Sequence, residues 1–130
     1  MYEVLPPEVR EFALRYLDSV AQLEALLLMR REPAVTWTVP ELAKRLYIDQ
    51  AGATGILEIL QKRQLVTFTR EQSGTPTYKY APAAQELEQL VVATEAAYSQ
   101  YLIPLTQLLH SKPSTAAHHF ADAFRFREKK

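Results

Sequence analysis

The chain has 130 residues, of which 48% are hydrophobic and 23% charged, so it can fold as one domain around a packed core. Its 15 basic residues are matched by 15 acidic ones, which excludes the overall basic excess typical of many nucleic-acid-binding proteins. The lack of cysteine excludes disulfides and thiol catalysis. The N-terminus is unlike a signal peptide and the longest apolar run, residues 25–29, cannot span a bilayer, so we expect a cytoplasmic protein without membrane contact.

The first third of the chain predicts two helices and a short strand. Two prolines precede an apolar periodic segment at residues 8–17. Ser19 and Gln22 have the spacing of a capping box, which opens a second helix over residues 20–32. The β-prone residues 35–38 then predict a short strand.

The middle of the chain predicts two helices and a hairpin. Thr38 and Glu41 form a second capping box, and Asp49 is the expected N-cap of a helix that ends near Arg63. After this helix, residues 65–70 and 77–80 alternate in polarity on either side of the turn-prone EQSGTP. This pattern indicates a β hairpin.

A long helix is predicted over residues 83–111, because its apolar residues recur in steps of three and four. Pro104 is expected to kink it. The apolar seam spans ~35 Å at 1.5 Å per residue, more than a small domain covers, so we expect a second copy of the chain to bury it. The alternative is a core stripe within one chain. The predicted dimer residues are Leu87, Leu90, Val91, Tyr98, Tyr101, Leu102, Leu105 and Leu109.

The tail, residues 112–130, combines five positive and two negative residues with three phenylalanines, Phe120, Phe124 and Phe126. Two interpretations stand side by side: these phenylalanines pack on the rest of the same chain or on a second copy, or they enter a groove of another protein. Contact with nucleic acid through the basic end is a weaker third. The chain therefore divides into residues 1–82, 83–111 and 112–130.

No catalytic or metal-binding pattern stands out. His118 and Asp122 have the i, i+4 spacing of metal ligands, but no third ligand is evident, and solvated tail histidines are the favoured interpretation. The sequence contains no glycine-rich phosphate loop and no nucleophile motif. We therefore expect neither an enzyme nor a bound cofactor or metal.

The order of elements over residues 19–82, with ELAKRLYID joining two helices and QKRQLV leading into a hairpin, resembles the winged helix-turn-helix superfamily. Ala43 stands where that motif has a small residue, while Gln64 stands where it often has glycine. The following long helix resembles the dimerising helix of PadR-like or MarR-like bacterial regulators. The resemblance implies a mainly α fold with a small β hairpin, and a dimeric transcription regulator that binds double-stranded DNA.

The helix in YIDQAGATGILEILQKRQLV resembles the DNA-reading helix of this superfamily. The resemblance implies a DNA-binding set of Lys44, Gln50, Ala51, Gly52, Thr54, Gly55, Lys62, Arg70 and Lys79. Of its groove-facing residues only Gln50 and Thr54 offer polar side chains for base contacts. Residues 40–80 carry six positive and four negative charges, and Glu58 lies near the groove-facing side. Two hypotheses follow: weak or shape-based DNA readout, or a protein-interaction module that no longer binds DNA and uses the long helix and the tail.

Overall fold

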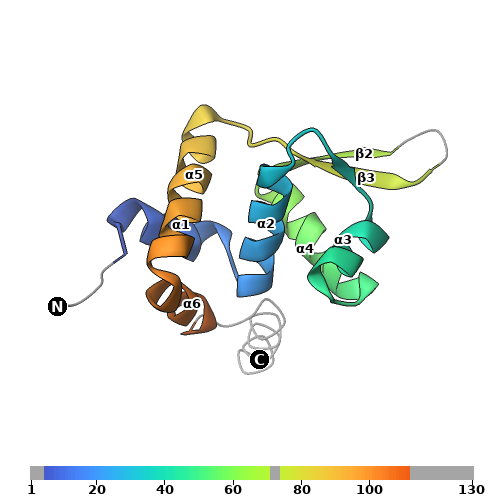
Figure 1. The fold of residues 1–130 in the computed structure, drawn as a ribbon. Helices are drawn as coiled ribbons and strands as arrows, with labels where there is room; N and C mark the ends of the chain where they lie inside the picture. The colour runs from blue at the N-terminus through green and yellow to red at the C-terminus, as the bar shows by residue number, and fades with distance from the viewer. Residues whose placement is uncertain (1–4, 71–73, 112–130) are drawn as a thin grey trace, which may run out of the picture.

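The computed structural model describes residues 5–70 and 74–111, which contain six helices and one three-stranded antiparallel sheet (Figure 1). The elements are α1 (Pro7–Tyr16), α2 (Val20–Arg31), β1 (Thr36–Trp37), α3 (Val39–Leu46), α4 (Gln50–Lys62), β2 (Val66–Arg70), β3 (Pro76–Tyr80), α5 (Gln85–Gln100) and α6 (Leu102–Ser111). The predicted fold class, mainly α with a small hairpin, is confirmed. The tail at residues 112–130, with its three phenylalanines and two histidines, lies outside the described residues.

The start of α2 shows how the sequence sets a helix boundary. The Ser19 hydroxyl accepts a hydrogen bond from the Gln22 backbone N–H at 3.1 Å, as the cap predicts. The Gln22 side chain accepts from the backbone N–H of Asp18, not from that of Ser19. The reciprocal bond of the box is thus displaced by one residue, and Gln22 is buried.

The predicted hairpin is confirmed, and β1 extends it to a sheet in the order β1-β3-β2. Trp37 of β1 pairs with Tyr78 of β3, so the strand before α3 is tied to the strand after the hairpin turn. In Figure 1, β2 and β3 project as a wing beyond α3 and α4. The hairpin follows α4 directly, because Gln64 takes a left-handed backbone (φ 65°) without being glycine.

One continuous core joins the N-terminal, middle and C-terminal helices. Its largest fully buried side chains are Phe12, Leu17, Leu23, Leu26, Leu27, Met29, Leu42, Leu57, Leu60, Leu65, Leu105 and Leu109. Each contributes about 1.5–3 kcal/mol of apolar burial relative to an exposed side chain. The last two belong to α6, so the C-terminal helix is part of the core of its own chain.

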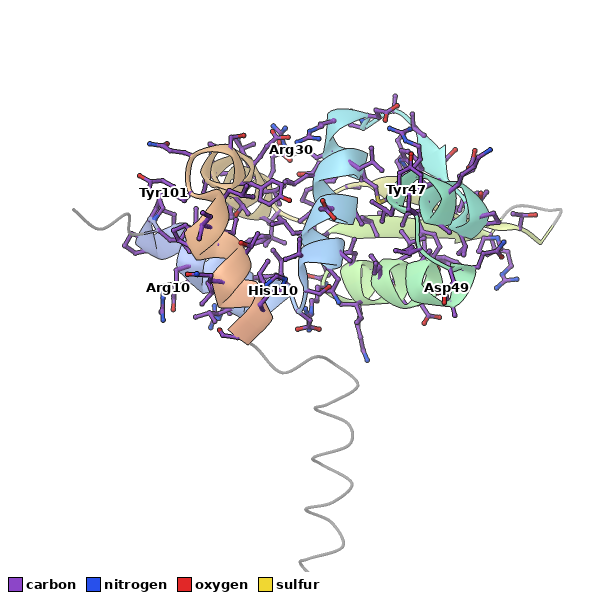
Figure 2. All side chains as sticks on the ribbon, turned by 60° about the horizontal axis from the view of Figure 1, so that its bottom comes forward. Arg10, Arg30, Tyr47, Asp49, Tyr101 and His110 are labelled. Carbon is purple, nitrogen blue, oxygen red and sulfur yellow. The ribbon has the colours of Figure 1, made fainter. Side chains whose placement is uncertain are left out.

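The prediction of one long helix over residues 83–111 was wrong, although the region is helical. The chain breaks at Tyr101, whose backbone (φ −123°, ψ 45°) ends α5 before α6 begins. Pro104 explains the break: it lacks an N–H, and in a continuous helix its ring would clash with the carbonyl of Gln100. In the first turn of a new helix neither problem arises. α6 therefore turns away from the axis of α5 and contacts α1 and α2 (Figures 1 and 2).

This turn changes the environment of the predicted dimer seam. Leu87, Val91, Leu105 and Leu109 are buried within the chain itself. Leu90, Tyr98 and Tyr101 are half-buried against the same core, and Leu102 is 48% exposed. We expected a second copy of the chain because the seam would otherwise be exposed to solvent. The packing of α6 onto its own chain buries most of the seam without a second copy.

Ion pairs between α2 and α5 join the middle of the chain to its C-terminal helices. Glu95 lies 2.6 Å from Nη1 of Arg30 and 3.1 Å from Nε of Arg31. Arg30 also lies 3.8 Å from Glu88, which accepts a hydrogen bond from the hydroxyl of Tyr80 on β3. Burial, and then the neighbouring Glu88 carboxylate, raise the pKa of Tyr80. Figure 2 shows Arg30 at this join.

Candidate nucleic-acid interface

The α3–turn–α4 segment is fixed by caps on both helices. Thr38 and Glu41 form the predicted reciprocal capping box of α3. The chain turns at Tyr47, which is left-handed (φ 58°) and 94% exposed. Asp49 then caps α4 by accepting a hydrogen bond from the Gly52 N–H at 2.7 Å (Figure 2). The predicted N-caps of both helices are confirmed.

α3 and α4 contact each other through small and aliphatic residues. Ala43, the small residue expected at the crossing, is 4% exposed, and its carbonyl accepts from the Ile48 N–H at 3.0 Å. α4 buries Ala53, Ile56, Leu57 and Leu60 as its spacing predicts. The local geometry is thus that of two crossed helices, with the first turns of α4 left open to solvent.

The outward line of α4 consists of Ala51, Gly55, Glu58 and Lys62, which follow at steps of four, three and four residues opposite the buried face. All are exposed except Gly55, which is half-buried. Lys62 is the only positive charge on this line and Glu58 the only negative one. The line therefore begins with small uncharged residues and ends with one negative and one positive side chain.

The two glycines of α4 have different surroundings. A Cβ added at Gly52 would lie 3.0 Å from Oδ1 of Asp49, the oxygen that caps the helix. A Cβ added at Gly55 would meet nothing within 4 Å. Gly52 thus makes room for the cap, whereas Gly55 leaves an open surface.

The wing places its two predicted basic residues on opposite faces. Arg70 is opposite Pro76 and Lys79 is opposite Thr67 in the β2–β3 ladder, and side chains alternate between faces at every residue. The Arg70 guanidinium lies 5.9 Å from the ring centroid of Phe68, on the same face, and donates to the Gly74 carbonyl at 3.1 Å. Only one of the two, Arg70, shares a face with Phe68.

The Arg70 face of the wing adjoins the outward line of α4. Tyr78 lies opposite Phe68, with ring centroids 5.2 Å apart. Burial raises the pKa of Tyr78, and the negative charge of Glu58 raises it further, while Arg70 lowers it. Both charges thus act on the Tyr78 hydroxyl, and β2 contacts α4, so this face of the wing is turned toward α4.

The structure brings together only part of the predicted DNA-binding set. Ala51, Gly55 and Lys62 share the outward line, and the Arg70 face adjoins it. The remaining predicted residues lie around this surface: Gln50 and Gly52 are exposed in the first turn of α4, Thr54 is half-buried at its flank, Lys44 is exposed on α3, and Lys79 is on the far face of the wing.

The sequence did not identify Phe68 as part of the candidate surface, although it is 41% exposed and lies beside Arg70. The signal was present, because residues two apart on a strand share a face. It missed Tyr47 as well, for which the sequence held no signal, because the left-handed turn that leaves this side chain in solvent depends on how α3 and α4 cross.

The described residues contain no group of three histidine or acidic side chains placed to hold a metal ion. Within residues 5–70 and 74–111, no helix combines the length and the apolar character needed to cross a membrane.

Several solved structures share this fold over most of the chain. The adhesin competence repressor AdcR from Streptococcus pyogenes is 18% identical, with a TM-score of 0.51 over 92% of this chain and 86% of that one. The reduced form of MarR from E. coli is 16% identical, with a TM-score of 0.51 over 97% and 98%. BpsR from Bordetella bronchiseptica, whose DNA binding is regulated by 6-hydroxynicotinic acid, is 20% identical, with a TM-score of 0.50 over 94% and 84%.

No protein-family profile and no curated protein sequence matches the chain. The structural likenesses, all at low sequence identity, show the fold, which is the winged helix-turn-helix that the order of elements predicts. Function is a separate question, because one fold carries many functions.

Proposed function

We propose that this chain is a winged-helix DNA-binding transcription regulator that acts as a dimer and reads DNA weakly, by shape more than by base contacts. The observation that carries the proposal is the open outward line of α4 together with the Arg70 face of the wing, whose strand β2 contacts α4. A helix and a hairpin presented together suit the major groove and the adjoining backbone. Two similar structures, a repressor and a protein with regulated DNA binding, support the same function.

The weakness of the readout follows from the residues on this surface. Bidentate arginine is the strongest base-reading side chain, and α4 presents none on its outward line. Glu58 repels phosphate. The Asp49 carboxylate also occupies the N-terminus of α4 and accepts the Gly52 N–H, so this helix end is a poor phosphate site. What remains is close approach of the backbone at Ala51 and Gly55, together with charge from Lys62 and Arg70.

The proposed dimer surface is the junction of α5 and α6. Leu102 and Ile103 are 48% and 64% exposed, and they adjoin half-buried Tyr101. Two neighbouring large apolar residues in solvent favour a contact, and two-fold pairing of identical chains is the simplest one. Sedimentation tests it: Leu102→Glu is expected to give monomers, while Gln107→Glu, also exposed on α6, leaves the dimer intact. A Leu102→Glu protein that stays dimeric moves the interface elsewhere.

A titration with random duplex DNA at two salt concentrations tests the DNA-binding function. Each phosphate contact contributes about −0.9 to the slope of log K against log salt, so real contact gives affinity that falls steeply with salt. We expect weak binding with a slope of a few units. Absence of binding at the lower salt concentration contradicts the proposal and favours a winged-helix module for protein contacts.

A further inference from the structure

Two grooves of nearly equal size on the described surface carry opposite charge. The basic groove, about 450 Å³, lies between α2, α3 and α5 and has Arg31 and Arg45 against Glu24. The acidic groove, about 460 Å³, lies mainly between α1 and α5 and has Glu8, Glu11 and Glu86 against Arg15. Their difference in charge distinguishes the occupants that each can accept.

Three carboxylates of the acidic groove form no ion pair within the described part of the chain. Among residues 5–70 and 74–111, the ion pairs use other acidic groups, and none includes Glu8, Glu11 or Glu86. The two arginines of the basic groove, in contrast, already pair with Glu95 and Glu32. The acidic groove therefore offers free carboxylates, whereas the basic groove offers cations with partners.

The wall of the acidic groove is aromatic and aliphatic. The rings of Phe12 and Tyr16 stack with centroids 5.1 Å apart and an interplanar angle of 21°. Tyr16 and Leu90 are half-buried, so part of each side chain faces the groove. An apolar wall beneath free carboxylates suits a segment that has aromatic and basic residues close together.

The chain itself contains such a segment. Residues 120–130 hold Phe120, Phe124 and Phe126 with four basic and two acidic residues. We propose that this segment docks in the acidic groove of its own chain, with phenylalanine against Tyr16 and Leu90 and the basic side chains beside the free carboxylates. The basic groove fits it less well, because its single carboxylate, Glu24, lies among the arginines Arg31 and Arg45.

The length of the chain permits this docking. α6 ends at Ser111 and contacts α1, the helix that carries Glu8 and Glu11. The nine residues from Ser111 to Phe120 span up to ~30 Å when extended, at 3.3–3.6 Å per residue. A segment starting beside α1 therefore reaches a groove walled by α1.

Docking has a structural consequence that does not depend on DNA binding. Gln64, between α4 and β2, and Ala84, before α5, also line the acidic groove. A segment seated there contacts α1, α5 and the end of α4 at once. The docked segment therefore connects the end of α4, the helix that bears the outward line, with α1 and α5.

Paramagnetic relaxation in the full chain tests the proposal. The chain has no cysteine, so Ala123→Cys gives a single site for a spin label. We expect broadening of the amide signals of Glu8 and Glu11 that is stronger than any broadening at Arg45. Absence of broadening at Glu8 and Glu11, or stronger broadening at Arg45, overturns the proposal.

Charge and aromatic variants of the labelled protein sharpen this test. The triple variant Glu8→Gln, Glu11→Gln, Glu86→Gln changes only exposed residues, and it is expected to lose the broadening. Phe124→Ala is expected to lose it as well. Glu24→Gln, in the basic groove, is the matched control and keeps it. Broadening that survives the triple variant contradicts docking by charge.

Mixing separates docking within one chain from exchange between two. When spin-labelled protein without ¹⁵N is mixed with unlabelled ¹⁵N protein, docking within one chain gives no broadening. Broadening at Glu8 and Glu11 in the mixture shows that the segment comes from a second copy, and it overturns the proposal.

Discussion

α4 and α5 are both amphipathic helices, but their exposed faces have different roles. α4 buries four residues and leaves an outward line that begins with Ala51 and Gly55. α5 also buries four residues, yet its Glu88 and Glu95 pair with Arg30 of α2. The periodicity of apolar residues identifies the buried side of each helix. Whether the other side contacts a neighbouring helix, as in α5, or remains open to solvent, as in α4, depends on the residues that face it.

The largest expected effect is on stability and concerns α6. It shows whether this helix belongs to the core of its own chain or to an interface with a second copy. Leu105→Ala removes a fully buried side chain and is expected to lower the free energy of unfolding by about 2–5 kcal/mol, since it leaves a cavity. Urea denaturation measures the change. Gln107→Ala, at an exposed position on the same helix and outside the proposed dimer surface, is the control and is expected to have a small effect. Equal losses for the two variants contradict the packing of α6 into the core.

Much of the fold was predictable because its determinants are local. Thr38, Glu41 and Asp49 mark helix starts through bonds to backbone groups three residues away, so their pattern is visible in the sequence. The hairpin was predictable from alternation and turn residues. In contrast, the break at Tyr101 depends on what α6 can pack against. Pro104 indicated a kink, but only the contacts with α1 and α2 show that the chain folds back.

The candidate site was less predictable, because it depends on contacts between distant segments. That Arg70 and Lys79 lie on opposite faces follows from the register of the hairpin, which the sequence left open. The position of the Arg70 face relative to α4 depends on how the wing packs on that helix. The different surroundings of Gly52 and Gly55 depend on the positions of neighbouring side chains, which the sequence does not give.

A smaller effect is expected at the join between α2 and α5. Glu95→Gln keeps the shape but removes the charge that faces Arg30 and Arg31, and the side chains of Arg30 and Glu95 are only about a quarter exposed. We expect a loss of about 1–2 kcal/mol in the free energy of unfolding, reduced at high salt. The control is Glu32→Gln, whose partner Arg45 is more exposed and whose loss should stay below about 1 kcal/mol. If the two variants lose the same amount, the join is no stronger than a surface ion pair.

The wing provides the next test, through DNA binding instead of stability. Arg70→Ala with Lys79→Ala is expected to weaken binding to all duplexes alike and to reduce the salt slope by about one unit for each phosphate that the wing no longer neutralises. Because the two residues lie on opposite faces, the single variants show which face meets DNA. We expect Arg70→Ala to account for the larger part, since its face of the wing is the one turned toward α4. An unchanged slope in the double variant removes the wing from the interface.

The smallest expected effect, and the most direct test of the open line on α4, is a gain of affinity at Gly55. Gly55→Arg adds a cation where a new Cβ meets nothing within 4 Å, and it removes a helix penalty of up to ~1 kcal/mol. If DNA lies against this line, the variant should bind random duplex several-fold more tightly, with a salt slope steeper by about one unit. Circular dichroism first establishes that the helix content is kept.

Gly52→Arg is the matched control: it adds the same charge one turn earlier, but its Cβ would lie 3.0 Å from the Asp49 oxygen that caps α4, so it should lower the thermal midpoint. A folded Gly55→Arg protein whose DNA affinity and salt slope match those of the wild type shows that DNA does not approach this line, because a long cation at its centre would otherwise reach a phosphate.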